Sequence, residues 1–336
     1  MHWLSKLTKC SDNYVYQRGG VFASSLVYQA KRFIMRRKQG VMSRGGGTWI
    51  IPALIAMSVI QFFPGVLSLF MGFTNLGVSN IRNIGNVKFV GLANFARIFT
   101  PGTAEGNSFL TSMIGTLIYT FCSAVLGYLL GLGLALLMNQ EFPGRSIIRA
   151  LMIVPWIVPN VVGAFIWRVI YLSEYGVLSK LMRGMGFQQN IYFLMNELAL
   201  PSLIVAHLWG SLPFMMISIL AGLQTIPHEL YEACKIDGGN VFQRFWHVTM
   251  PGISLISVML FLLSFIRGSG EFTLPYVMFG NTTPPGSANL ISVLVYQTSF
   301  TSWEFGRGAA MSTFILIIMM VLAIIYMRTT VLRKKV

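Results

Sequence analysis

The stretch MIGTLIYTFCSAVLGYLLGLGLALLM, residues 113–138, decides the fold class of this chain, and it contains no charged residue. A helix crosses the hydrocarbon core of a bilayer with about 20 predominantly apolar residues, so this stretch is long enough to span a membrane. Stretches of similar length and character recur at Trp49–Phe73, Leu151–Leu172, Ala199–Leu223, Gly252–Phe279 and Gly308–Met327. The sequence therefore predicts an all-α integral membrane protein with six transmembrane helices.

The composition agrees with this prediction. Of the 336 residues, 54% are hydrophobic and 10% are charged, whereas a soluble domain carries about 25% charged residues. The apolar runs are also too long for the strands or short helices of a soluble core. Arg267 and Glu271 interrupt the fifth stretch.

The net charge of +15 follows a topological pattern. Six spans place both termini on one side of the membrane. The terminal segments and the loops after spans two and four carry 17 basic residues, whereas the other side carries six. The positive-inside rule then predicts that both termini are cytoplasmic. The charge does not indicate nucleic acid as a partner.

Two terminal segments flank the predicted transmembrane domain of residues 48–330. Residues 1–47 form a basic extension, in which residues 21–38 place apolar side chains at helical spacing among five basic ones. This pattern predicts an amphipathic helix that lies either on membrane lipid or on a partner protein. Residues 331–336 form a basic cytoplasmic tail.

The sequence contains no pattern typical of an enzyme or of a nucleotide site. It has no G-x-x-x-x-G-K-[ST] phosphate loop, no H-E-x-x-H and no G-x-S-x-G, and its three cysteines and four histidines are scattered. We therefore expect no catalytic residue, no metal site and no cofactor in this chain. Any ATP chemistry has to come from another polypeptide.

The loop of residues 225–251 predicts two short helices joined by a turn. Thr225 is expected to cap the first helix, and Gly238 and Gly239 to end it. Asn240 is expected to cap the second helix, which runs until Pro251 opens the fifth span. Asp237 is expected to hold the turn by hydrogen bonds to nearby backbone amides. An ordinary connector between two spans is the alternative reading.

The spacing Glu232-Ala233-Cys234-x-x-Asp237-Gly238-Gly239-x5-Phe245-x5-Pro251 resembles the EAA loop of permease subunits of ATP-binding cassette importers. Two of its positions depart from that pattern, but Cys234 and Gly239 are both small. Segments that resemble the larger maltose-type permease are Phe89–Phe95, Arg149, Pro155-Trp156 and Trp167.

The resemblance implies a type I importer permease in which this loop is the coupling helix. The coupling residues would be Glu232, Ala233, Cys234, Asp237, Gly238, Gly239, Phe245 and Pro251. The implied partners are a second homologous permease, two ATPase subunits that hold ATP and Mg, and an extracytoplasmic solute-binding protein.

The resemblance also implies that the segments flanking the loop contact a sugar. The candidate residues on this solute path are His207, Trp209, Gly210, Ser211, Phe214, Ser264, Arg267, Gly268, Glu271 and Tyr276. Trp209, Phe214 and Tyr276 are aromatic and suited to stacking on pyranose faces.

Arg267 and Glu271 leave two interpretations open. Charges at membrane depth face a polar cavity or each other; on a helix, a spacing of four residues also suits an ion pair. If Arg267 faces the cavity, its guanidinium offers bidentate recognition of a carboxylate. Together with the sugar-contacting role that the resemblance implies, this predicts import of a saccharide, specifically an anionic oligosaccharide.

Two other classes compete with the importer permease. An ion-coupled secondary transporter of a small polar solute is the first, although such carriers often use buried carboxylate or histidine relays, and Glu271 is the one acid well inside a predicted span. A membrane-bound enzyme is the second, and it would show catalytic turnover by the isolated chain.

Overall fold

The computed structural model describes residues 46–186, 192–280 and 283–330. These residues are helical apart from connecting loops and one isolated bridge between Thr74 and Phe89. The chain forms two compact units, residues 1–67 and residues 68–336. The helix predicted for residues 21–38 and the tail of residues 331–336 lie outside the described residues.

The described part of the first unit is one apolar helical run. It comprises α3 (Gly46–Met57), the π-helical segment η1 (Ser58–Phe62) and the start of α4 (Phe63–Met71). All side chains of residues 50–67 are exposed within the chain. Because these side chains are mostly apolar, they suit a helix surrounded by lipid.

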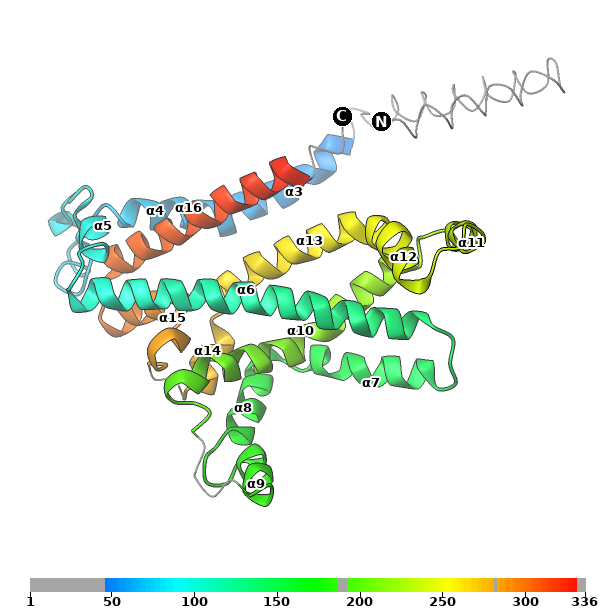
Figure 1. Ribbon diagram of the computed structural model, residues 1–336. Coiled ribbons are helices and arrows are strands. Elements are labelled where there is room, and N and C mark those ends of the chain that lie inside the picture. Colours follow the sequence, from blue (N-terminus) through cyan, green and yellow to red (C-terminus); the bar gives the residue numbers. More distant parts are fainter. Residues whose placement is uncertain (1–45, 187–191, 281–282, 331–336) are drawn as a thin grey trace, which may run out of the picture. The chain divides into compact units, whose positions relative to one another are not determined.

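The second unit is a bundle of long helices connected by short ones (Figure 1). Its α-helices are α5 (Ala93–Ile98), α6 (Ala104–Asn139), α7 (Arg145–Ile157), α8 (Asn160–Ile170), α9 (Val177–Gly184), α10 (Ala199–Leu223), α11 (His228–Ile236), α12 (Val241–Arg244), α13 (Met250–Ser269), α14 (Thr273–Met278), α15 (Ile291–Tyr296) and α16 (Phe305–Thr330). Short 3-10 segments lie at η2 (Ile84–Asn86), η3 (Asn196–Leu198) and η5 (Gly286–Ala288), and π-helical ones at η4 (Phe245–Thr249) and η6 (Gln297–Thr301).

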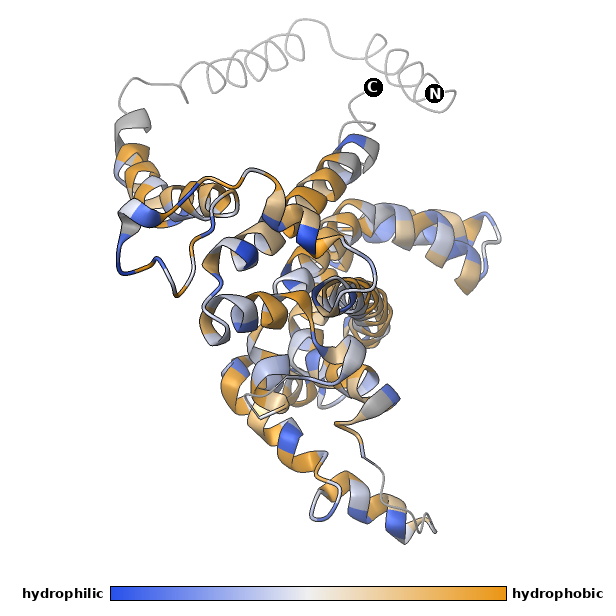
Figure 2. Ribbon diagram, turned by 90° about the vertical axis from the view of Figure 1, so that its left-hand side faces the viewer, coloured by the Kyte–Doolittle hydropathy of each residue, from blue (hydrophilic) through white to orange (hydrophobic). Residues whose placement is uncertain are grey.

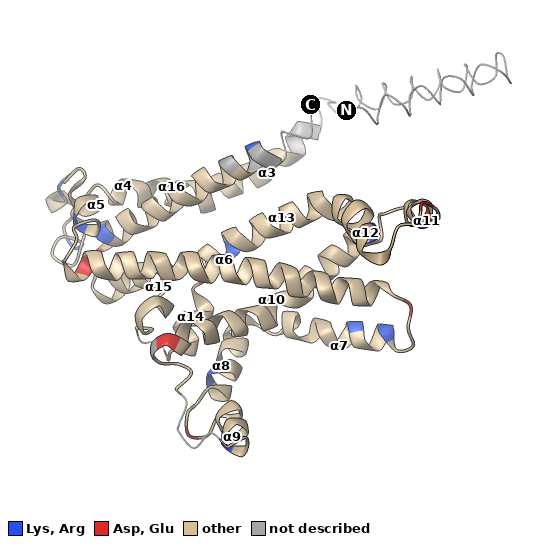
Figure 3. Ribbon diagram, in the orientation of Figure 1, with Lys and Arg blue, Asp and Glu red and all other residues tan. Residues whose placement is uncertain are grey.

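Helix α6 is the central element of the second unit. It packs along α10 and also contacts α13, α15 and α5. Three clusters of buried hydrophobic residues join α6 to its neighbours: one with α8, α10 and α14, one with α10 and α13, and one with α5, α15 and α16. Charged residues gather near helix ends, and α10 carries none (Figure 3). Figure 2 shows the matching hydrophobic character along most of the helices.

The described residues contain five helical runs that are long and apolar enough to cross a membrane, or six if one bent pair counts as a span. The bent pair is α7 and α8, which meet at 96° where the third span was predicted. Pro155 and Pro159 explain the bend. Val158 is held in an extended conformation (ψ 126°), as expected for a residue that precedes proline.

The fifth predicted span also differs from the structure. It was expected to continue to Phe279, but α13 ends at Ser269 and Gly270 caps it. At its other end, helix runs through α12 and η4 into α13, so Pro251 lies in the first turn of α13 rather than at the start of the helical run. The segment of residues 267–271, which was predicted to lie inside a helix, therefore lies at the C-terminal end of α13.

Candidate functional site

A cavity of about 280 Å³ opens between α7, α8, α10 and α13. The bend at Pro155 and Pro159 brings α7 and α8 around one side of it, and the end of α13 closes another. Of the ten residues predicted on the solute path, eight line it: His207, Trp209, Gly210, Ser211, Phe214, Ser264, Arg267 and Glu271. Segments far apart in the sequence thus converge on one space.

Aromatic rings form much of the cavity wall. Trp167 and Trp209 meet edge to face with ring centroids 6.1 Å apart. Trp156 and Phe214 lie 5.8 Å apart at a tilted angle. Large flat apolar surfaces with a few polar groups are typical of small-molecule sites, and here they suit a solute with flat apolar faces.

Arg267 and Glu271 do not form an ion pair in the described structure. The Arg267 guanidinium lies over the ring of Phe214, 5.4 Å from its centroid, which is a cation–π arrangement. The Glu271 carboxylate instead accepts a hydrogen bond from the amide of Leu274, in the first turn of α14 (3.0 Å). Because α13 ends before Glu271, the helical spacing that would pair the two charges is absent. Both side chains line the cavity.

Other polar groups of the cavity are held by neighbours. His207 Nδ1 lies 2.8 Å from the hydroxyl of Tyr119, a fully buried residue of α6. This contact fixes the orientation of the imidazole. The indole N–H of Trp167 is buried and has no hydrogen-bond partner among the described residues. Ser264 and Ser211 complete the polar lining.

Two predicted path residues lie beside the cavity instead of lining it. Gly268 is buried against α6, where an added Cβ would lie 3.3 Å from Thr120 Cγ2. Tyr276 stacks on Phe272 with centroids 4.9 Å apart. Conversely, Trp156, Asn160 and Trp167 line the cavity without having been predicted as site residues. The sequence signal that could have identified them is the pair Pro155 and Pro159, because a bend there turns the neighbouring side chains of α7 and α8 toward the cavity.

The loop of residues 225–251 forms the predicted helix–turn–helix. Helix α11 ends in a Schellman motif, in which the Gly239 amide donates to Cys234 O (2.8 Å) and the Gly238 amide to Lys235 O (3.1 Å). Gly238 has φ of +79°, the left-handed region that favours glycine. At Gly239, an added Cβ would lie 2.7 Å from the Cys234 carbonyl oxygen. Each glycine is therefore required for a different reason.

The capping predictions for this loop had mixed outcomes. Asn240 caps α12 in a capping box with Gln243, as predicted. The prediction for Thr225 was wrong, because its hydroxyl donates to Gly222 O at the end of α10 and Pro227 precedes α11. The Asp237 side chain makes no hydrogen bond to a described residue, so backbone bonds hold the turn instead.

The outer surface of this loop is exposed and partly apolar. Glu232 and Ala233 are exposed, and Ile236 is 86% exposed. Cys234 is turned toward Gly239, where an added Cβ would meet its Sγ. Phe245 packs on the core cluster of α6, α10 and α13, and Pro251 lies in the first turn of α13. An exposed apolar surface on a short rigid loop is typical of a protein–protein contact.

A helical membrane bundle with a solute-sized cavity and a rigid surface loop defines a transport protein of the membrane. The chain belongs to the family of binding-protein-dependent transport system inner membrane components, whose model matches residues 127–332. It is therefore a multi-pass inner-membrane transport subunit and not the ATPase, and subunits of this family carry no cofactor. Among the described residues, no cluster of three potential metal ligands occurs.

Two relatives and one solved structure place the chain more closely. It is 28% identical to a trehalose/maltose transport system permease of Thermococcus litoralis, over 86% of this chain and 94% of the relative. It is 27% identical to an arabinooligosaccharides transport system permease of Bacillus subtilis, over 85% and 89%. Its fold is similar to a chain of a bacterial transporter that imports the acidic polysaccharide alginate, with TM-score 0.72 and 19% identity over 89% of this chain and 98% of the other.

Proposed function

We propose that this chain forms half of the membrane channel of a saccharide importer driven by ATP hydrolysis on separate subunits. The cavity carries the proposal. Its two aromatic pairs, each containing a tryptophan, and its hydroxyl, imidazole and charged groups match a solute that has flat apolar faces and polar edges. The names of relatives that cover nearly the whole chain support a saccharide, since they are trehalose/maltose and arabinooligosaccharide permeases.

The loop of residues 225–251 is the proposed contact with the ATPase. Its end of the bundle also bears Arg145, Arg149, Lys235 and Arg244, which favours a cytoplasmic location, with both termini on that side. The remaining proposed partners are a second homologous permease, a second ATPase subunit and an extracytoplasmic solute-binding protein. Lipid surrounds the outer helices, and residues 1–47 are proposed to be a cytoplasmic extension.

An acidic saccharide is the proposed substrate class. Arg267 lines the cavity and has no carboxylate partner within salt-bridge distance among the described residues. Its contact with the Phe214 ring leaves the guanidinium N–H groups available to a ligand. A solute carboxylate would supply the missing bidentate partner.

Uptake by the intact transporter tests this proposal. The complex, with its binding protein, is reconstituted in vesicles and given maltodextrins, arabino-oligosaccharides and uronate-bearing oligosaccharides. We expect ATP-dependent uptake, with a uronate-bearing glycan preferred. Charge-assisted hydrogen bonds contribute about 1.5–3 kcal/mol, so Arg267→Gln should raise the apparent KM for that glycan by at least tenfold, with a smaller effect for Arg267→Lys.

The outcomes separate the parts of the proposal. Transport of neutral glycans that is indifferent to Arg267→Gln would contradict the acidic substrate but leave the saccharide importer standing. Uptake that follows an ion gradient without ATP would contradict the importer itself. If none of these glycans stimulates ATP hydrolysis, a saccharide is ruled out as the solute.

A further inference from the structure

Six aromatic residues form a continuous series outside the cavity. We call the series the aromatic track, and its members are Phe272, Tyr276, Tyr296, Phe300, Phe305 and Trp303. Neighbouring rings lie between 4.9 and 6.0 Å apart, centroid to centroid. The rings come from the start of α14, from α15 and η6, and from the turn that leads into α16. None of the six side chains is buried, and Phe300 and Trp303 are 58% and 49% exposed.

The track begins beside the cavity. Glu271 lines the cavity and directly precedes Phe272, the first ring of the track. The Ser292 hydroxyl donates to the Glu271 carbonyl oxygen (2.6 Å), so α15 is fastened to this point. From there the rings lead to the turn before α16, at the end of the bundle where α5 lies (Figure 1). The track therefore joins the cavity to that end.

The surroundings of the track favour a polar solute over lipid. Tyr276 and Tyr296 are ring neighbours that carry hydroxyl groups, and the η6 segment within the track reads QTSFT. The Gln297 amide also donates to the Thr283 hydroxyl (3.1 Å). The lipid-type surface of α16 is different, because its exposed side chains include Leu316, Ile317 and Met320. Polar groups in hydrocarbon are unfavourable, whereas aromatic faces with hydroxyl edges suit a sugar.

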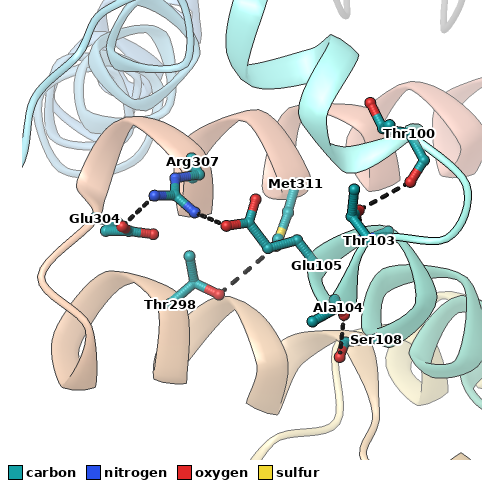
Figure 4. A network of polar contacts seen from close by, with 10 residues as sticks. Thr100, Thr103, Ala104, Glu105, Ser108, Thr298, Glu304, Arg307 and Met311 are labelled. Atoms are coloured by element: carbon teal, nitrogen blue, oxygen red, sulfur yellow. Dashed lines mark hydrogen bonds and ion pairs between the residues drawn. The ribbon is translucent and has the colours of Figure 1, made fainter.

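The far end of the track is held rigidly. Trp303 has φ of +59°, a conformation that is unfavourable for a bulky residue. Its carbonyl accepts from the Val78 amide (3.0 Å), and the next residue, Glu304, donates its amide to Thr298 O (3.0 Å). The side chain of Glu304 pairs with Arg307, which also pairs with Glu105 of α6 (Figure 4). These bonds maintain an exposed tryptophan in a strained turn, as at many functional sites.

We propose that the aromatic track is a second saccharide-binding site, along which the chain of an oligosaccharide lies as one end of it enters the cavity. This inference rests on the proposed function and assigns the part of the solute that the cavity is too small to hold. Pyranose rings present flat faces of C–H bonds, which pack on the negative face of an aromatic ring. A longer glycan can contact more of these rings than a short one, so the track binds long glycans better than short ones.

Chain-length dependence of transport tests the track. The reconstituted complex is assayed with the longest glycan of the panel that stimulates ATP hydrolysis and with its disaccharide fragment. Phe300→Leu and Tyr296→Leu remove a ring face but keep an apolar side chain. We expect each to raise the apparent KM for the long glycan about fivefold, with little change for the disaccharide and none in ATP hydrolysis without solute. Phe300→Tyr, which keeps the ring, should restore the wild-type KM.

Phe121→Leu and Phe165→Leu are the matched controls, because both rings are exposed (56% and 49%) and lie outside the track. If the track variants change the KM equally for the long glycan and the disaccharide, or change it for neither, the track is not a binding site, although the importer proposal stands. Loss of assembly with the second permease in both track variants would assign the rings to the subunit interface and also overturn it. If no glycan stimulates the wild-type complex, the proposed function fails and the track fails with it.

Discussion

Gly238 and Gly239 show how neighbouring identical residues serve different purposes. Gly238 has open space around it, since an added Cβ would meet nothing within 4 Å, but its φ is +79°. At Gly239, φ is not in the left-handed region, but an added Cβ would lie 2.7 Å from a backbone oxygen. The first position therefore excludes side chains by conformation and the second by space.

This difference gives a prediction for the two alanine variants. Gly238→Ala should destabilise the turn by about 1–2 kcal/mol, the cost of the left-handed region for a residue with a Cβ, and Gly238→Asn by less. Gly239→Ala should be more disruptive, because the oxygen it meets is the acceptor for its own amide. Amide hydrogen exchange of residues 234–239 in the purified complex measures the effect, and we expect about tenfold faster exchange in Gly238→Ala.

A double variant separates the two contacts at Gly239. Cys234→Ala removes the Sγ atom that also crowds this position but leaves the carbonyl oxygen in place. In the double variant Cys234→Ala with Gly239→Ala, the amides of residues 234–239 should therefore exchange as fast as in Gly239→Ala alone. Restored protection in the double variant would show that the sulfur, and not the backbone, excludes the side chain.

Sequence patterns predicted residue roles well where one local bond decides them. Asn240 was identified as a cap because its side chain reaches the amide three residues on, and the structure has that bond at 2.8 Å. Thr225 was also predicted as a cap, wrongly, since its hydroxyl donates instead to an acceptor at the end of α10 (Gly222 O, 2.8 Å). Choosing between two neighbouring helix ends requires their geometry, which the sequence does not contain.

At the scale of elements, Gly131 lies where α6 and α10 pack most tightly among the glycines of α6 that face α10. An added Cβ at Gly131 would lie 2.5 Å from Met215 Cγ and 2.9 Å from its Cβ, whereas at Gly133 it would meet nothing within 4 Å. Glycine at a helix contact lets two backbones approach in lipid. Gly127, Gly131 and Gly133 all lie in the same apolar stretch, and the sequence alone does not distinguish them. The structure is needed to show that Gly131 is the one crowded by Met215.

The pair Gly131 and Gly133 therefore forms a matched test. Both alanine variants gain the same helix propensity, about 1 kcal/mol, so their difference reports the contact with Met215. We expect Gly131→Ala to be less stable than Gly133→Ala by about 1–3 kcal/mol, the usual cost of overpacking. Thermal unfolding in detergent measures it. Equal midpoints would show that α10 moves away from α6 without cost.

The elements that the sequence predicted least well are those that build the cavity. Apolar length predicted a continuous third span, yet α7 and α8 meet at 96°, because two prolines four residues apart set the direction of the chain. Hydropathy also predicted a fifth span through Glu271, although α13 ends at Ser269. Hydropathy measures where a chain can enter lipid. It does not report where helices break to surround a solute.

At the scale of the molecule, the cavity and the loop of residues 225–251 share the same two helices. The loop connects α10 to α13, and both helices also line the cavity, α10 through His207–Phe214 and α13 through Ser264 and Arg267. A force applied to the loop therefore reaches the cavity wall through rigid helices. If an ATPase docks on the loop, as proposed, this arrangement provides a physical route for energy coupling between that subunit and the solute.

Our last prediction is that this loop couples ATP hydrolysis to transport. Gly238→Trp places a bulky side chain on its exposed surface, close to the exposed Ala233 and Ile236. We expect the variant to insert and to receive solute from the binding protein, but to lose transport and solute-stimulated ATP hydrolysis. Gly144→Trp is the matched control, because Gly144 also has a positive φ (+85°) with open space around it and directly precedes α7, whose start lies at the same end of the bundle as the loop (Figure 1).

The control separates strain from docking. Both variants carry the same conformational cost of a side chain in the left-handed region, and both add an exposed indole. Loss of coupling in Gly238→Trp alone therefore assigns the effect to the surface of the 225–251 loop. Equal loss in both variants would assign it to strain or to general crowding of that end. Full coupling in Gly238→Trp, or an ATPase that binds normally to a complex whose loop is replaced by a flexible linker, would reduce the loop to a connector between two spans.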